Sequence, residues 1–386
     1  ASNTQSVSGA GNVGGIVGVL EGATIDGATN NGTVTATGNN VGGVVGWVVN
    51  GATIKGSLDN SKSIKGKDKV GGIVGYNQGS VQQGSYTVNG NCKISGNSSI
   101  GGFIGYNGKD GLEISGYTNN SQVSGTNYVG GIVGSTDATL TIKNSNNNAT
   151  ITGYGYVGGI LGECNGASVT IIGCHNSGEV NITGGNVGGI LGYANGNCKI
   201  DIKNCYNDGL VKSTGTAGNV GGIVGRAYTS STDASAIKIF NCYNIGEVSN
   251  ANSDSVGGIV GYARSESAGV LVVKYCYNKA KISGETYIGG IVGSIYTGKY
   301  ATIENCYTTV DGTYTITATG TNDKTAGAII GGAYGGQHVT GNFNVINSWG
   351  FYSNATVLGG HNTGMDRFGA YVLVEGFGKQ VYPIID

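Results

Sequence analysis

The feature of this sequence that most limits its fold is a six-residue motif that recurs along almost the whole chain. The motif reads Val-Gly-Gly-Ile-Val-Gly at residues 70–75. Ten clear copies and a degraded eleventh begin at Val13, Val41, Val70, Ile100, Val129, Val157, Val187, Val220, Val256, Ile288 and Ala326. Successive copies start 28 to 38 residues apart. A period of this size, repeated this often, indicates one structural unit that is stacked on itself.

Composition excludes several other classes of protein. The 386 residues include 77 glycines and 1 proline, and without a period this would indicate a low-complexity chain. However, 38% of the residues are hydrophobic and recur regularly, so apolar surface is available to bury. Glycine does not fall at every third position, which excludes collagen. The net charge of −1 and the lack of a basic stretch argue against a nucleic-acid partner. No apolar run is long enough to predict a membrane span.

Each repeat contains three strand-like pieces. The first is the glycine motif, whose nearly continuous apolar character predicts a strand that is covered on both faces. The second is a short alternating stretch such as residues 200–202, and the third is a Thr/Ser-rich segment such as residues 281–284. Polar corners such as residues 204–209 carry Asn, Asp and Gly, which tolerate left-handed backbone angles. Three strands and three corners in about thirty residues predict one coil of a parallel β-solenoid.

We therefore predict an all-β fold, a right-handed parallel β-solenoid (β-helix) of about eleven coils, roughly 28–38 residues each, with a C-terminal cap. Residues 1–331 would form the repeats, and residues 332–386 the terminal coil and the cap, within one continuous domain. Residues 6–9 resemble the third strand of an incomplete coil. We expect missing upstream residues or a partner to cover that N-terminal edge.

The glycines of the motif have two alternative explanations. In stacked coils they would allow close backbone approach, or a bulge between the large residues. In a phosphate-binding loop they would lie between a strand and a helix, or before a Lys-Ser/Thr pair. Neither context is present in this sequence, so the structural explanation is favoured.

The motif, followed by a segment of the form I-x-N-C-Y-N-x-G-x-V, resembles the GLUG repeat from Gly11 to about Trp349. GLUG repeats occur in surface-anchored and secreted bacterial proteins, including relatives of the IgA-peptidase family, where they lie outside the catalytic domain. The resemblance implies an extracellular, adhesin-like or spacer role and no reaction. The His-Glu-x-x-His signature of those peptidases is missing, because none of His175, His338 and His361 precedes a glutamate.

Other signatures of catalysis and metal binding are also missing. The sequence holds no Cys-x-x-Cys pair and no Gly-x-Ser-x-Gly elbow, and its acidic residues are scattered. We predict no catalytic residues, metal or cofactor. Carboxylates could still pair across coils, so a glycan-processing lyase or hydrolase on a β-helix is the alternative. A third interpretation is a purely structural spacer or an ice-binding solenoid. Ice binding needs a regular threonine array, and the threonines at residues 33–37 have no counterpart in later coils.

Five of the eight cysteines occupy one corner position of the repeat: Cys174, Cys205, Cys242, Cys276 and Cys306. Other coils place Ala28, Ser57, Ser145 and Ser348 there, with Tyr117 as the exception. A position shared by Ala, Ser and Cys predicts a small buried site with reduced thiols. The alternative is a disulfide ladder, but parallel side chains in register seldom reach the required torsion angle. We predict no disulfides; Cys92, Cys164 and Cys198 lie outside this column.

An aromatic column follows the small corner residues, and its members are His175, Tyr206, Tyr243, Tyr277, Tyr307 and Trp349. The next position holds Asn176, Asn207, Asn244 and Asn278, which we expect to stack as an amide ladder. The rings either pack on one another or form a flat strip that receives sugar rings, with the amides as hydrogen-bonding groups. The same two interpretations apply to a shorter column of Trp47, Tyr76 and Tyr106.

Together, these features predict a non-enzymatic, adhesin-like rod on a bacterial surface or in secreted form. Its expected partner is an extracellular glycan, or a host or bacterial surface protein. The aromatic column from His175 to Trp349 is the predicted ligand-binding strip.

Overall fold

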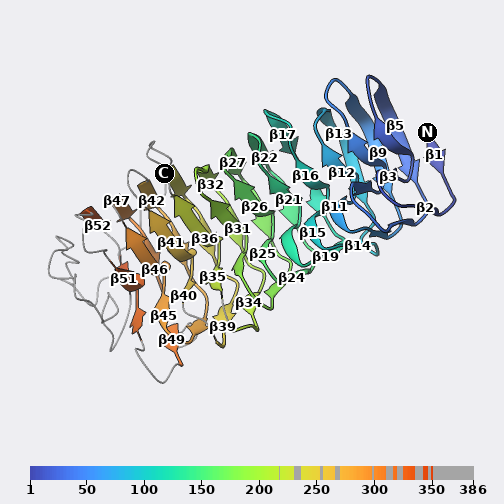
Figure 1. Cartoon of the computed structure of the whole chain (residues 1–386). Helices are drawn as coiled ribbons and strands as arrows, with labels where there is room; N and C mark the ends of the chain where they lie inside the picture. Colours follow the sequence, from blue (N-terminus) through green and yellow to red (C-terminus); the bar gives the residue numbers. More distant parts are fainter. Residues whose placement is uncertain are drawn as a thin grey trace.

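The computed structural model describes residues 1–216, 218–229, 236–252, 255–265, 270–297, 300–309, 316–319, 325–334, 342–346 and 349–350. Within these ranges every helix or strand element is a β-strand, and each strand pairs in parallel with its counterparts in the neighbouring repeats. Figure 1 shows the coils stacked along one axis, which confirms the predicted parallel β-solenoid. The part of the predicted cap from residue 351 onward lies outside the described residues.

One coil in the middle of the rod shows the structural unit. Its strands are β30 (Asn186–Gly188), β31 (Leu191–Asn195), β32 (Lys199–Lys203), β33 (Tyr206–Asn207) and β34 (Val211–Ser213). They belong to five sheets, which we call C, D, E, F and B in that order. Within the described residues, sheets B, C and D each contain eleven strands, whereas sheets E and F each contain eight. The rod is therefore roughly 50 Å long at about 4.8 Å per coil.

The prediction of three strands per coil was wrong, because the predicted corner contains a short strand of its own, as at β33, and the glycine motif is not one strand. In the third coil it divides between β11 (Asp68–Gly71) in sheet C and β12 (Val74–Asn77) in sheet D, with a bend at Gly72 and Ile73. Polar corners have the predicted left-handed backbone, as at Asn204 with φ 54°.

Sheets C and D touch along the glycines of the motif. A Cβ atom on Gly71 would lie 1.9 Å from the carbonyl oxygen of Val74 and 2.8 Å from the nitrogen of Gly105. A Cβ atom on Gly75 would lie 2.4 Å from the nitrogen of Val41. Real Cβ atoms do not come this close to backbone, so only glycine fits. We call the contact made by the first and last glycines of each motif the glycine seam; it confirms the predicted close backbone approach.

The first three coils differ from the later ones on the side opposite the seam. There one long strand per coil replaces sheets E and F, namely β5 (Thr24–Asn30), β9 (Thr53–Asn60) and β13 (Ser80–Val88). Together with the short β1 (Ser2–Asn3) they form sheet A. Sheet E begins in the next coil with β17 (Leu112–Ser115), and sheet F begins with β18 (Thr118–Asn119). The two regions therefore share sheets B, C and D but not their remaining sheets.

The interior is one continuous apolar column. Val70, Ile73 and Val74 of a single motif are fully buried, and their counterparts in other coils stack on them. Among the described residues no helix has the length and apolar character needed to cross a membrane.

Candidate functional site

Sheet F carries the predicted aromatic column on very short strands. These strands are β28 (His175–Asn176), β33, β38 (Tyr243–Asn244), β43 (Tyr277–Asn278), β48 (Tyr307–Thr308) and β53 (Trp349–Gly350). The six aromatic positions pair in register from each coil to the next. Five of the predicted rings form one column, and the side chain of Trp349 lies outside the described residues.

The rings stack face to face along this column. The ring centroids of Tyr206 and Tyr243 are 4.8 Å apart, as are those of Tyr243 and Tyr277, with interplanar angles of 11° and 3°. Tyr307 continues the stack at 5.0 Å, and His175 begins it at 3.9 Å from Tyr206. Each ring is only partly buried. The faces therefore cover one another, and the rings offer a ligand their edges and phenol hydroxyls rather than flat faces.

The phenols of this column are suited to donate hydrogen bonds. Burial raises the pKa of Tyr243, Tyr277 and Tyr307 above the usual value for tyrosine. Neighbouring phenols add to the effect for Tyr243 and Tyr277. The hydroxyls are therefore protonated at neutral pH, and each can both donate and accept a hydrogen bond.

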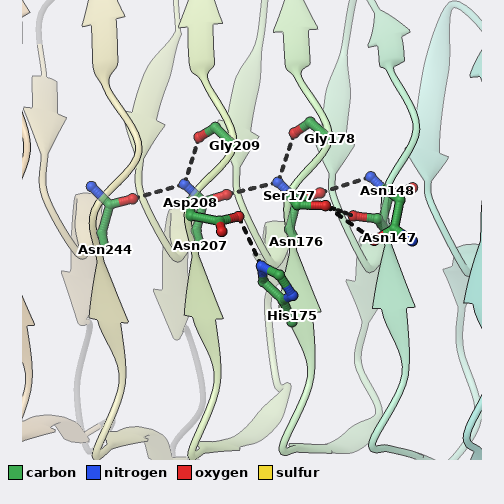
Figure 2. A network of polar contacts seen from close by, with 10 residues as sticks. All are labelled: Asn147, Asn148, His175, Asn176, Ser177, Gly178, Asn207, Asp208, Gly209 and Asn244. Atoms are coloured by element: carbon green, nitrogen blue, oxygen red, sulfur yellow. Dashed lines mark hydrogen bonds and ion pairs between the residues drawn. The ribbon is translucent and has the colours of Figure 1, made fainter.

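The predicted amide ladder is confirmed, and Figure 2 shows part of it. Asn176 donates from Nδ2 to Oδ1 of Asn207 at 2.7 Å, and Asn207 donates to Asn244 at the same distance. Each amide also donates to the carbonyl two residues ahead, as Asn207 does to Gly209 at 2.8 Å. These asparagines are fully buried, because alternate residues of a strand point to opposite faces. The idea that the amides contact a sugar beside the rings was therefore wrong.

A hydrogen bond between His175 and Asp208 closes the N-terminal end of the ring stack. Nε2 of His175 lies 2.7 Å from Oδ1 of Asp208, which belongs to the next coil (Figure 2). The contact fixes the orientation of the His175 ring on Tyr206, and Asp208 is exposed. The end of the column is therefore polar as well as aromatic.

The five corner cysteines are buried as predicted, and all eight cysteines are free thiols in the structure. One member of the predicted column was assigned wrongly. Leu58, not Ser57, pairs with Ala28, because the register shifts by one residue between Asp26 and Ala28. Ser57 is exposed beside this irregularity.

The second predicted column lies on sheet D. Trp47 of β8 (Val45–Val48) stacks on Tyr76 at 5.8 Å, and Tyr106 of β16 (Ile104–Asn107) meets Tyr76 edge-on at 5.4 Å. Lys69 places its Nζ atom 3.8 Å from the centroid of the Tyr76 ring. All three rings are partly exposed, so this column also reaches the surface.

Sequence reasoning missed the continuation of this column, which is buried at Glu163 and Tyr193. In later coils the same register position holds Glu163, Tyr193, Arg226 and Tyr262. The Arg226 guanidinium carbon lies 5.3 Å from the centroid of Tyr193 and 5.4 Å from that of Tyr262. The ring centroid of Tyr228, on the same strand β36 (Val224–Thr229), lies 5.7 Å from the same guanidinium carbon. Because the residue type changes from coil to coil, only the register of the strands could have revealed it.

Glu163 on β26 (Leu161–Asn165) is a second feature that the sequence did not indicate. Only 6% of its surface is exposed. Burial raises the pKa of its carboxyl to about 7, although a hydrogen bond with Asn195 opposes the shift. Burial raises the pKa of the Tyr128 and Tyr193 phenols, and the nearby Glu163 carboxylate adds to both shifts.

Some other charged side chains form isolated pairs between or within coils. Lys143 binds Glu113 at 2.8 Å, and Lys274 binds Glu304 at 2.6 Å. A pocket of about 240 Å³ between β13 and β17 is lined partly by Lys109, Asp110 and Glu113. Within the described ranges no group of three or more His, Cys, Asp or Glu side chains could hold a metal ion.

Comparisons with protein-family models, with curated proteins and with solved structures found no match to this chain. The GLUG resemblance therefore stays a prediction that depends on the repeated motif.

Proposed function

We propose that this chain is a non-enzymatic, adhesin-like rod that is secreted by a bacterium or attached to its surface. The rod would bind an extended glycan along its axis. The observation that carries the proposal is the column Tyr206–Tyr243–Tyr277–Tyr307, with ring spacings of 4.8 to 5.0 Å. A polymer lying along the axis would meet the same polar group in every coil. The spacing is close to the length of one sugar unit.

Because the rings stack on one another, a glycan would bind through hydrogen bonds and not by stacking on flat aromatic faces. Since the ring faces are occupied, the glycan hydroxyls would bind to the exposed phenol hydroxyls. Asp208 at the start of the column would supply a charged acceptor. Each such hydrogen bond contributes little alone, about 1 kcal/mol, so affinity would come from repetition over several coils.

Two observations favour a binding rod over the alternative of a glycan-processing enzyme. Acidic side chains such as Glu304 are paired singly with lysines, and Glu113, which shares a pocket with Asp110, is held by Lys143. The buried Glu163 lies near Tyr128 and Tyr193, and among the described residues no second carboxylate contributes to its shifted pKa. The GLUG resemblance supports the same proposal, including an extracellular location.

The test distinguishes the contribution of the phenol hydroxyls to binding from that of the ring stack. A glycan array identifies a ligand for the wild-type chain, and the double variant Tyr243→Phe/Tyr277→Phe is then compared with it. We expect roughly tenfold weaker binding with an unchanged melting temperature, because phenylalanine keeps the stack and removes two hydroxyls. Tyr154→Phe, at an exposed position outside the column, is the matched control and should bind as the wild type does.

Two results would overturn the proposal. One is unchanged affinity in the phenylalanine variant. The other is the absence of any glycan ligand, together with lower stability of Tyr243→Ala/Tyr277→Ala. In either case the column would serve packing alone.

A further inference from the structure

Two cysteines outside the corner column lie in direct contact. The Sγ atoms of Cys164 and Cys198 are 2.6 Å apart, and both side chains are fully buried. Cys164 belongs to β26 in sheet D, and Cys198 directly precedes β32 in sheet E of the next coil. Cys198 Sγ also lies 3.0 Å from the carbonyl oxygen of Cys164. The two thiols therefore meet at the corner between sheets D and E.

The register explains why this pair differs from the five corner thiols. Cys174 and Cys205 occupy equivalent positions in successive coils, since the residues that follow them pair in register. Their side chains therefore point the same way, which is unfavourable for a disulfide. Cys164 instead pairs in register with Ala194, and Ala167 takes the position equivalent to Cys198. The two thiols approach each other from different sides of the corner.

We propose that Cys164 and Cys198 form a disulfide that fastens two successive coils, whereas the corner cysteines stay reduced. The oxidant is a disulfide, either of low molecular weight such as oxidised glutathione or on a thiol–disulfide oxidoreductase. One Cys thiolate attacks the oxidant disulfide, forms a mixed disulfide and releases one thiol. The second Cys thiolate attacks the protein sulfur of the mixed disulfide and releases the second thiol. Two electrons pass to the oxidant, and the two thiol protons end on the released thiols.

The disulfide would join two neighbouring coils covalently, whereas the other contacts between coils are noncovalent. The two cysteines are 34 residues apart, about one full coil, so the cross-link joins neighbouring coils near the middle of the rod. Repeat arrays lose structure by separation of neighbouring units, and a covalent link opposes this step. This inference does not depend on glycan binding.

The test refolds the full chain from denaturant in glutathione buffers of increasing oxidised fraction, because both thiols are fully buried in the folded state and glutathione cannot reach them there. Free thiols are alkylated under denaturing conditions without reduction, and the digest is analysed by mass spectrometry. We expect a Cys164–Cys198 linked peptide, two hydrogen atoms lighter than the separate peptides, and alkylation of the other six cysteines. We also expect the oxidised chain to melt higher than the reduced chain, by on the order of 5 °C.

Matched variants keep the test interpretable. Cys164→Ala and Cys198→Ala should abolish both the linked peptide and the redox-dependent melting shift, and alanine already occupies the equivalent positions at Ala194 and Ala167. Cys205→Ala should keep both. Eight alkylated cysteines in the most oxidising buffer would overturn the proposal. Linkage between corner cysteines, such as Cys205 and Cys242, would overturn the register argument.

Discussion

The first three coils and the later coils have the same seam but different opposite walls. In both regions sheets C and D meet through glycine, as at Gly71 and Gly130. On the other side, the early coils carry the long strands of sheet A, and the later coils carry sheets E and F. Both regions carry aromatic side chains on sheet D, such as Trp47 and Tyr262, and the later coils add a stacked column on sheet F. One backbone unit can therefore present aromatic strips on different sides.

The boundary between the two regions is visible in the buried amides. The ladder from Asn3 through Asn30 to Asn60 ends where the next strand places Val88. A new ladder starts at Asn119 and continues through Asn278, which donates to Thr308. Between the two ladders the interior is filled by three stacked aromatic rings, namely Tyr86, Phe103 and Tyr117. The comparison suggests that the seam holds the rod together and that the opposite wall can vary.

Substitutions in the glycine seam should lower the free energy of unfolding most, and by equal amounts in the two regions. Gly71→Ala and Gly130→Ala would each place a Cβ atom 1.9 Å from a carbonyl oxygen. We expect each to cost on the order of 3–5 kcal/mol in the free energy of unfolding, measured by denaturant titration. Gly116→Ala is the control, because its added Cβ has open space and only φ of 73° is unfavourable, at about 1 kcal/mol. A mild effect at Gly71 alone would show that the two regions differ in their seam.

Substitutions in the amide ladders should lower the free energy of unfolding less, and by different amounts in the two ladders. Asn207→Ala removes donors to Gly209 and Asn244 and leaves the buried Asn176 amide without its acceptor. We expect a loss of about 2–4 kcal/mol in the free energy of unfolding. Asn60→Ala, at the end of the short ladder, should cost less. Equal losses by denaturant titration would contradict cooperation along the longer ladder.

Glu163 should make the stability of the later coils depend on pH. The folded pKa of about 7 exceeds the unfolded value of 4.5, so the folded state holds the proton more tightly. The stabilisation that Glu163 contributes is therefore complete below pH 4.5, falls as the pH rises from 4.5 to about 7, and then levels off, with a total loss of up to about 3 kcal/mol. Thermal melting across this window should show the slope in the wild type and in Glu21→Gln, an exposed control in the first coil. A slope that persists unchanged in Glu163→Gln would exclude Glu163 as its cause.

The smallest effect should come from the corner thiols. Cys242→Ala copies the first coil, where Ala28 occupies the same column, so we expect a loss of only about 1 kcal/mol in the free energy of unfolding. Thiol titration should find Cys242 unreactive in the folded chain and reactive after denaturation without reductant. Reaction in the folded chain would contradict the burial of this column.

The sequence alone determined the contacts between equivalent positions of the repeat. Its period predicted the parallel stacking, the amide ladder through Asn207 and the burial of Cys242, and all three are confirmed. The reason is geometric. In stacked coils each residue lies about 4.8 Å from its counterpart one period away, so a residue type repeated in sequence is repeated in space.

The tertiary structure decided the contacts between positions that are not equivalent. The bend within the glycine motif, the burial of Glu163 and the contact between Cys164 and Cys198 all depend on how each coil turns within its cross-section. That path is set by backbone angles at corners and by close approach at glycines, neither of which the period encodes. A one-residue irregularity beside Ala28 was enough to put Leu58 where the repeat alone placed Ser57, because a shift of one residue reverses the face to which a strand residue points.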